Sequence, residues 1–328
     1  MPTARIGGVR MGLARGASIP PMQTKDYLSV PDLSHAELDQ VLALAARLKQ
    51  DRANGRRALQ PLSGHHVALL FEKPSLRTRS TFTIAVRELG GEVIEPPADV
   101  ALGSRESVAD VARNLERWVS GAIVRTFAQA RLEEFARAAS RMHVVNALTD
   151  EEHPCQALAD MLTLIERWGD VRGRTLTFVG DGNNVAASLA HAGAMLGMHV
   201  RVASPREFEL PESVVGAVKH LTRFGGELRL FNDPVAAVQG ADAVYTDTWA
   251  SMGQEAKADA RAALFRPYQV NDALMHAADA EAVFMHCLPA HRGLEVTDAV
   301  MDSPASVVFD QAENRLHTQK ALLAMLMA

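Results

Sequence analysis

Val67-Ala-Leu-Leu-Phe71-Glu-Lys-Pro-Ser75-Leu76-Arg77-Thr78-Arg79 is the stretch that decides the fold of this chain. It opens with a short, continuous apolar run, which is typical of a strand buried in a parallel sheet. Residues 81–89 are compatible with a helix, which would end at Gly90-Gly91. The stretch therefore predicts a strand, a turn and a helix, the beginning of a parallel α/β unit.

The turn after this strand carries two hydroxyls and two guanidinium groups. Ser75 falls near the predicted helix N-terminus, where unpaired backbone N–H groups and the helix dipole favour an anion. Arg77 and Arg79 add forked donors that suit a phosphate or a carboxylate. The alternative is a solvated basic first turn, but positive charge at a helix start opposes the dipole unless an anion is present. We therefore interpret the turn as an anion cradle.

Length and composition limit the possible classes of protein. The 328 residues exceed a typical single core, so two domains are expected. The net charge of −5 argues against nucleic-acid or membrane-surface binding, and no apolar run approaches the roughly 20 residues of a membrane span. Cys155 and Cys287 lie far apart and have no metal-type spacing, so a reducing cytoplasm is the simplest location.

Helix and strand signals alternate along the whole chain. Ser34 and Glu37 form a capping-box pattern before an apolar helical stripe, and residues 92–105 are predicted as a loop. Apolar runs predict strands at 67–71, 122–124, 144–145, 176–179, 200–202, 228–230, 243–246 and 283–285. The pattern restarts at Gly169–Gly173, and residues 312–327 read as a final helix that packs back on the chain. We predict an α/β fold of two domains, each a mainly parallel sheet flanked by helices.

Polar groups follow several predicted strands, at the sheet ends where ligands bind. Arg125 ends one strand, and His153 and Gln156 can face one point across a helix start unless they simply cap that helix. Gly180-Asp-Gly-Asn-Asn184 is a weak dinucleotide turn, because Val185 stands where the third glycine belongs; it could equally offer two amides to a zwitterion.

Two more strand ends carry reactive groups. Asp247 could pair with a substrate ammonium or cap the next helix. His286-Cys-Leu-Pro-Ala-His291 places a thiol between two imidazoles. No cysteine pair at a metal-type spacing and no H-E-x-x-H pattern supports a metal, and a lone buried cysteine is usually inert, so the role of Cys287 stays open.

Together these stretches resemble the aspartate/ornithine transcarbamylase family and, within it, the ornithine carbamoyltransferases. The resemblance runs from about Lys25 to the C-terminus, and its motifs stand in the family's order. They are Ser75-Leu-Arg-Thr-Arg79, Arg125-Thr-Phe127, His153-Pro-Cys-Gln156, Asp247-Thr-Trp-Ala-Ser-Met-Gly253, His286-Cys-Leu-Pro289 and Glu313-Asn-Arg315. Several matches in the right order are far more specific than any single one.

The resemblance implies transfer of the carbamoyl group of carbamoyl phosphate to the δ-amine of L-ornithine, giving L-citrulline and phosphate without a metal or cofactor. It implies a homotrimer, or a multiple of trimers, of two-domain subunits. Residues 25–153, joined by the C-terminal helix 311–328, would bind carbamoyl phosphate, and residues 154–310 would bind ornithine. Residues 1–24 would be an N-terminal extension, expected to be disordered.

The family's functional residues carry over position by position. Those implied to bind carbamoyl phosphate are Ser75, Leu76, Arg77, Thr78, Arg125, His153, Gln156, Cys287, Leu288 and Arg315. Those implied to bind ornithine are Asn184, Asp247, Ser251 and Met252. Those implied to be catalytic are Arg77, Arg125, His153, Gln156 and Cys287. Since no side chain is an obvious general base, we expect ornithine to enter with a neutral δ-amine and the departing phosphate to accept the proton.

Two positions depart from the family pattern. Leu76 stands where the family usually has Thr, which removes a hydroxyl but keeps the backbone N–H, and in this it is similar to the N-acylornithine branch. Ala101 stands where a Gln is common, in a loop that reaches a neighbouring subunit's site in the family. Two alternatives therefore remain: a transcarbamylase for N-acetylornithine, N-succinylornithine or another amine, and a non-catalytic metabolite-binding α/β protein.

Overall fold

The computed structural model describes residues 5–6, 9–10, 19–56, 59–97, 102, 105–249 and 258–327. The chain divides into two compact units: unit 1 comprises Met1–Asp170 with Glu313–Ala328, and unit 2 comprises Val171–Ala312. This division falls within the segment where the sequence pattern restarts. The assignment of residues 25–153 and 154–310 to two substrates stays a prediction. Its boundary at residues 153 and 154 lies before the helix of residues 154–168, whereas the two units divide after that helix.

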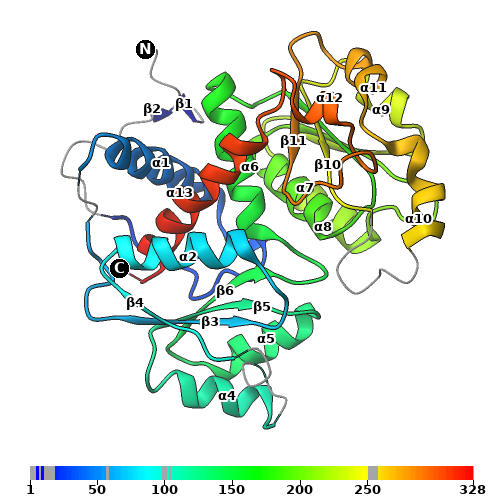
Figure 1. Ribbon diagram of the computed structural model, residues 1–328. Helices are drawn as coiled ribbons and strands as arrows, with labels where there is room; N and C mark the ends of the chain where they lie inside the picture. The colour runs from blue at the N-terminus through cyan, green and yellow to red at the C-terminus, as the bar shows by residue number, and fades with distance from the viewer. Residues whose placement is uncertain are drawn as a thin grey trace. The chain divides into compact units, whose positions relative to one another are not determined.

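A parallel sheet forms the centre of unit 1, with its strands in the order β4-β3-β5-β6. The strands are β3 (His66–Phe71), β4 (Glu92–Ile94), β5 (Gly121–Arg125) and β6 (His143–Leu148). The helices are η1 (Val30–Asp32), α1 (His35–Ala53), α2 (Leu76–Glu88), α4 (Val108–Leu115), α5 (Gln129–Ala138), α6 (Pro154–Trp168) and α13 (Val308–Met327), most of which belongs to unit 1. α4 and α5 bury one face of the sheet, and α1, α2 and α13 lie on the other (Figure 1).

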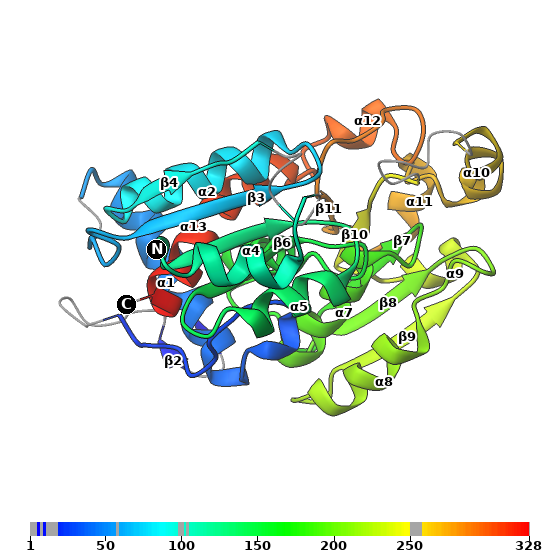
Figure 2. The same ribbon diagram turned by 90° about the horizontal axis from the view of Figure 1, so that it is seen from below.

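A second parallel sheet forms the centre of unit 2, in the order β11-β10-β7-β8-β9. The strands are β7 (Thr175–Val179), β8 (His199–Ala203), β9 (Glu227–Phe231), β10 (Ala243–Thr246) and β11 (Val283–His286). The helices are α7 (Asn184–Leu196), α8 (Glu212–Leu221), α9 (Pro234–Val238), α10 (Ala258–Phe265), η3 (Arg266–Tyr268), α11 (Asp272–Ala277) and α12 (Asp298–Met301). α9, α11 and α12 share an apolar core with one face of this sheet, and α7 and α8 lie on the opposite face (Figure 2).

The predicted α/β fold is confirmed, because both sheets are parallel and are flanked by helices. Every strand that the apolar runs predict is present, and some extend further, such as β6 beyond residues 144–145. The capping box of α1 is also present, since the Ser34 hydroxyl accepts from the Glu37 N–H and the Ser34 N–H donates to the Glu37 carboxylate. Among the described residues, no helix combines the length and apolarity that crossing a bilayer requires.

The prediction of a loop over residues 92–105 is wrong at its start, where β4 pairs in parallel with β3. β4 is only three residues long and lies at the edge of the sheet. Glu92 and Ile94 are exposed and Val93 is half-buried. A short edge strand of this kind lacks the continuous apolar run by which the other strands are recognised.

Parts of the N-terminal extension have regular structure. β1 (Arg5–Ile6) and β2 (Val9–Arg10) pair antiparallel. The Met22 N–H donates to the Met325 carbonyl at 3.1 Å, which attaches this segment to α13. The other residues before residue 19 lie outside the described residues, so the predicted disorder of the extension stays a prediction.

Strand register places the polar strand ends of each unit side by side. In unit 1, Phe71 pairs with Arg125, and Arg125 pairs with Leu148. In unit 2, Thr246 pairs with His286. Because the carboxyl ends of parallel strands meet at one edge, the segments that follow β3, β5 and β6 start together, and so do those that follow β10 and β11.

We predict that Gly182→Ala destabilises unit 2. A Cβ at Gly182 would lie 2.6 Å from the backbone of Glu209 and Leu210, which cannot move away as a flexible side chain could. The expected loss in the free energy of unfolding is about 1–3 kcal/mol, measured by urea denaturation. Gly216→Ala is the control, because nothing lies within 4 Å of its Cβ and it is in a helix, so it should stabilise by about 0.5–1 kcal/mol. Equal stability of both variants would contradict the close backbone approach.

Candidate active site

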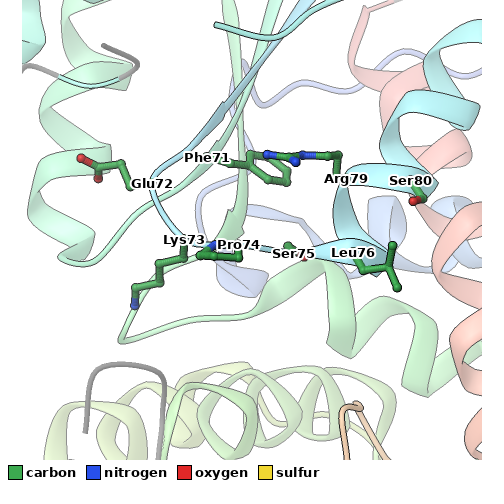
Figure 3. Close-up of a pocket in the computed structure, with 8 residues that line it drawn as sticks. All are labelled: Phe71, Glu72, Lys73, Pro74, Ser75, Leu76, Arg79 and Ser80. Atoms are coloured by element: carbon green, nitrogen blue, oxygen red, sulfur yellow. The ribbon is translucent and has the colours of Figure 1, made fainter. Parts of the chain in front are cut away.

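The turn between β3 and α2 borders a pocket of about 430 Å³, in unit 1. The residues that line it are Phe71, Glu72, Lys73, Pro74, Ser75, Leu76, Arg79 and Ser80 (Figure 3). Ser75 is the N-cap of α2, and its side chain makes no capping hydrogen bond. The first N–H groups of a helix have no partner within it, so the N-terminus of α2 offers donors where the sequence predicts an anion cradle.

Two side chains of the predicted cradle are directed elsewhere. Arg79 Nε lies 2.6 Å from Glu95 Oε1, and its guanidinium stands 6.0 Å from the centre of the Phe71 ring (Figure 3). The Leu76 side chain is 78% exposed. Arg79 is therefore paired with Glu95 through Nε, and Leu76 offers the cradle only its backbone N–H. We expect Arg77 to be the guanidinium that meets an anion, although it is not among the residues that line the pocket.

Arg315, on α13, joins the cradle to the start of α6. Its guanidinium donates to Gln156 Oε1 at 2.5 Å and to Thr78 Oγ1 at 3.0 Å. Gln156 Nε2 donates in turn to Asp160 Oδ1 at 2.8 Å. All four side chains are buried. The alternative in which His153 and Gln156 cap α6 is wrong, because His153 is the N-cap residue but makes no side-chain capping bond, and Gln156 bonds to Asp160 and Arg315.

His153 is buried among three guanidinium groups. Burial, followed by the positive charges of Arg315, Arg125 and Arg77, holds the pKa of His153 well below its ordinary value. The imidazole is therefore neutral at neutral pH, with one N–H to donate and one lone pair. A neutral donor within a cluster of fixed positive charge is suited to bind an anion or a strongly polarised carbonyl oxygen.

Cys155 is unsuited to be a nucleophile although it stands between His153 and Gln156. Burial raises the pKa of its thiol to about 12, against the opposing effect of the Arg315 charge. Its sulfur lies 3.3 Å from the carbonyl oxygen of Asn146. A protonated, buried thiol of this kind has a packing role.

Lys73 is a candidate functional residue that the sequence analysis missed. Its side chain is only 7% exposed, and its ammonium lies 2.5 Å from Asp150 and 4.2 Å from the centre of the Phe127 ring. These contacts place a buried cation in the wall of the pocket. The sequence signal that could have identified Lys73 is the charged pair Glu72-Lys73, which directly follows an apolar strand.

In unit 2, Asp247 and Cys287 meet at the ends of β10 and β11. The Cys287 thiol donates to Asp247 Oδ1 at 3.0 Å, and the Thr248 N–H donates to the same oxygen at 2.8 Å. Asn183 Nδ2 donates to the other oxygen, Oδ2, at 2.8 Å. Three donors from separate positions therefore hold the carboxylate at the sheet edge, so Asp247 and Cys287 form one polar group.

The amide that contacts Asp247 is Asn183, and the assignment of Asn184 to ornithine stays a prediction. Asn183 Oδ1 also caps α7 by accepting from two backbone N–H groups, and Asn184 is the first residue of that helix. Two consecutive Asn residues look alike in sequence, and only the backbone of the turn determines which one faces the acid. Ser251, Met252 and Ala101 lie outside the described residues.

A buried pair holds the turn that follows β11. His286 Nε2 lies 3.3 Å from Glu295 Oε1, and neither side chain is exposed. The Leu288 N–H donates to His286 Nδ1 at 2.8 Å, so the imidazole proton is on Nε2 and points to Glu295. Leu288 has a φ of +59°, which is uncommon for this residue type. The pair thus fixes the turn that carries Cys287.

Asp247, His286 and Cys287 could receive a metal ion, because each offers one ligand atom and these atoms lie within 4.8 Å of one another. Both ring nitrogens of His286 already have hydrogen-bond partners in Leu288 and Glu295, and the Cys287 thiol bonds to Asp247. A metal would have to displace these bonds. The sequence prediction of metal-free chemistry stays a prediction.

Arg261, at the start of α10, is a second residue that the sequence analysis missed. Its Nε donates to the Trp249 carbonyl at 2.6 Å, and its Nη2 lies 2.5 Å from Asp181. Its guanidinium also stands 4.7 Å from the centre of the Phe208 ring. Arg261 thereby connects Trp249 to the turn after β7. No local sequence pattern indicates this role.

Two family models match the chain. One, described as "Aspartate/ornithine carbamoyltransferase, carbamoyl-P binding domain", matches residues 25–166, and the other, described as "Aspartate/ornithine carbamoyltransferase, Asp/Orn binding domain", matches residues 172–326.

Relatives and solved structures of the same type resemble the chain over nearly its whole length. The ornithine carbamoyltransferase of Symbiobacterium thermophilum is 49% identical over 94% of this chain and 99% of its own length. That of Anoxybacillus flavithermus is 47% identical over 93% and 98%. The structure of the ornithine carbamoyltransferase from Pyrococcus furiosus has a TM-score of 0.89 at 45% identity, over 95% of this chain and 98% of that one.

We predict that His153 stays neutral at pH 6.5. Its pKa is lowered by burial and by neighbouring cations, so its NMR imidazole signals should show no titration midpoint near about 6.5, the ordinary value. His153→Gln identifies the signals, and the chain unfolded in urea is the reference that should titrate near about 6.5. A midpoint at or above 6.5 in the folded protein would contradict the cationic environment described for this residue.

Proposed function

This chain belongs to the aspartate/ornithine carbamoyltransferase family, and we propose that it transfers the carbamoyl group of carbamoyl phosphate to the δ-amine of L-ornithine, forming L-citrulline and phosphate. The observation that carries the proposal is the group of three guanidinium groups, Arg77, Arg125 and Arg315, around the neutral imidazole of His153. The carbamoyl-P binding model matches residues 25–166, which include Arg77, Arg125 and His153. The Asp/Orn binding model matches residues 172–326, which include nearly all of unit 2 and also Arg315.

Unit 1 binds carbamoyl phosphate in this proposal. The phosphate lies at the N-terminus of α2, against the backbone N–H groups, the Ser75 and Thr78 hydroxyls and Arg77. The Leu76 backbone N–H is one of these donors. Support comes from the pocket beside Ser75 and from the bond between Thr78 and Arg315, which connects the phosphate end to the carbamoyl end.

The carbamoyl group lies toward Arg125, His153 and Gln156. Attack by a neutral amine on the carbamoyl carbon develops negative charge on its oxygen, and Arg125 and the N–H of His153 stabilise that charge. The Arg315 guanidinium already donates a hydrogen bond to Gln156 Oε1 at 2.5 Å. A positive charge therefore stands beside Gln156 before the reaction begins. Most of the acceleration then comes from fixed electrostatics and from alignment of the substrates.

Proton transfer needs no side-chain base in this mechanism. Ornithine reacts with its δ-amine deprotonated, and the departing phosphate accepts the proton that the amine loses. The bond from the amine nitrogen to the carbamoyl carbon forms as the bond from that carbon to the phosphate oxygen breaks. Arg77 and the N-terminus of α2 stabilise the phosphate as it leaves.

Unit 2 binds ornithine in this proposal. Asp247 pairs with an ammonium group of the substrate, and Asn184, Ser251 and Met252 complete the family's pattern. The contacts of Asp247 with Asn183 and Cys287 support the role, because they hold its carboxylate in place. The resemblance to the family assigns Cys287 and Leu288, and likewise Arg315, to carbamoyl phosphate.

We further propose a cytoplasmic homotrimer, or a multiple of trimers, that takes small-molecule substrates and binds neither nucleic acid nor membranes. The resemblance to the family supports the trimer, and the net charge of −5 agrees with the absence of a polyanionic partner. Transfer occurs without a metal or cofactor, in arginine biosynthesis or arginine catabolism.

A second candidate is a transcarbamylase for an N-acylated ornithine, which Leu76 favours because it replaces the usual Thr of the cradle.

We predict that ornithine is nevertheless the substrate. Carbamoyl phosphate is incubated with ornithine, N-acetylornithine, N-succinylornithine, putrescine or aspartate, and phosphate release is measured. Release should be at least about tenfold faster with ornithine than with either acylated amine, since acylation removes the ammonium group that would pair with Asp247. Faster release with an acylated amine would favour the second candidate, and none with any amine would favour a binding protein.

Arg77→Ala should reduce kcat/KM for carbamoyl phosphate by about 10²–10³-fold, because it removes a cation that stabilises the leaving phosphate. The measurement is citrulline formation at saturating ornithine. Arg79→Ala is a matched control on the same helix, since its guanidinium is paired with Glu95 and half-exposed, and it should change the rate less than about tenfold. Similar losses in both variants would contradict the separate role given to Arg77.

A further inference from the structure

Asn314 lies next to Arg315 on α13 and makes hydrogen bonds to two other helices of unit 1. It is fully buried. Its Nδ2 donates to Thr163 Oγ1 at 2.9 Å and to Glu166 Oε2 at 2.8 Å, both on α6. Its Oδ1 accepts from Lys49 Nζ, on α1, at 2.8 Å. One side chain therefore links α13 to α6 and α1, which are on either side of it.

The partners allow only one orientation of this amide. The Thr163 hydroxyl uses its own proton to donate to the Ala159 carbonyl at 2.8 Å, so it can only accept from Asn314. The Glu166 carboxylate also only accepts, and the Lys49 ammonium only donates. Lys49 closes the network with a 2.9 Å contact to Glu166. The Asn314 amide is thus bound by three partners with matched donor and acceptor roles.

The network contributes to the rotational setting of α13, together with the buried residues that follow Asn314 on this helix. Consecutive helical residues point about 100° apart, so the face that Asn314 presents to α6 sets the direction of Arg315. A rotation of about 20° would move a guanidinium about 7 Å from the helix axis by roughly 2 Å. A shift of that size breaks a hydrogen bond. The contacts of Arg315 with Gln156 and Thr78, at 2.5 and 3.0 Å, therefore depend on the neighbouring amide.

We propose that Asn314 is a positioning residue for carbamoyl phosphate, which sets the direction of Arg315 through Thr163, Glu166 and Lys49. The proposal rests on the function proposed above, because it assigns Arg315 to the carbamoyl phosphate site. It goes beyond that function by placing a determinant of substrate affinity in an inter-helical network, where Asn314 itself touches no substrate.

Asn314→Leu tests the proposal, because it keeps the branched shape and removes all three hydrogen bonds. We expect KM for carbamoyl phosphate to rise at least about tenfold while KM for ornithine changes less than about twofold. Thr318→Val is the matched control on the same helix. The buried Thr318 hydroxyl donates to the backbone carbonyls of Asn314 and Arg315, at 3.0 and 3.4 Å, and to neither of their side chains. Its loss removes no bond of the Asn314 amide or of the Arg315 guanidinium, so both KM values should stay unchanged. Equal effects of the two variants on KM would overturn the proposal.

A double-mutant cycle separates positioning from general destabilisation. If Asn314 acts through Arg315, then Asn314→Leu should raise KM for carbamoyl phosphate less than about twofold in an Arg315→Lys background. Additive effects would overturn the proposal. Thr163→Val removes one acceptor of the Asn314 amide and should give a smaller rise of the same kind, which keeps the test available if Asn314→Leu does not fold.

Direct binding distinguishes this inference from the proposed function. Calorimetry with carbamoyl phosphate alone, without any amine, needs no turnover. Weaker binding by Asn314→Leu than by the wild-type protein, with Thr318→Val unchanged, supports the positioning role even if no citrulline forms. Citrulline formation by the wild-type protein together with equal carbamoyl phosphate affinity in all three proteins would contradict the positioning role and leave the proposed function standing.

Discussion

Hydrogen bonds from Arg315 connect three helices of unit 1 at the candidate site. They reach Thr78 at the start of α2 and Gln156 at the start of α6 from a helix near the end of the chain. Arg315 is 237 residues from Thr78 and 159 from Gln156 along the chain, and the three side chains meet at one polar centre. Because a buried guanidinium without partners is costly, the three helices are held together by the same contacts that build the site.

The positive charge of this centre determines its chemistry. Burial and the positive charges of Arg315, Arg125 and Arg77 oppose protonation of His153 and lower its pKa, so the imidazole remains a neutral donor. The three guanidinium groups repel one another because all are positively charged, and a bound anion reduces that repulsion. A small phosphorylated substrate therefore suits both the charge and the helix N-terminus. The acidic group of unit 2, centred on Asp247, is of opposite sign and suits an amine.

Much of the fold could be predicted from local pattern. The apolar runs at 67–71 and 283–285 and the Ser34 capping box depend on neighbouring residues, and the structure confirms them. β4 could not be predicted, because a three-residue edge strand carries no comparable signal. The same limit applies to the site: motifs located Gln156 and Asp247, but their partners Asp160 and Asn183 follow from tertiary packing alone.

The most direct test of this account is a crystal structure with a stable analogue in which a methylene group replaces the bridging oxygen of carbamoyl phosphate. We expect the phosphonate within about 3 Å of Arg77 and of the first backbone N–H groups of α2, with the amide oxygen toward Arg125 and His153. A phosphonate bound away from the N-terminus of α2, or no binding at saturating concentration, would contradict the assignment of this cationic centre to carbamoyl phosphate.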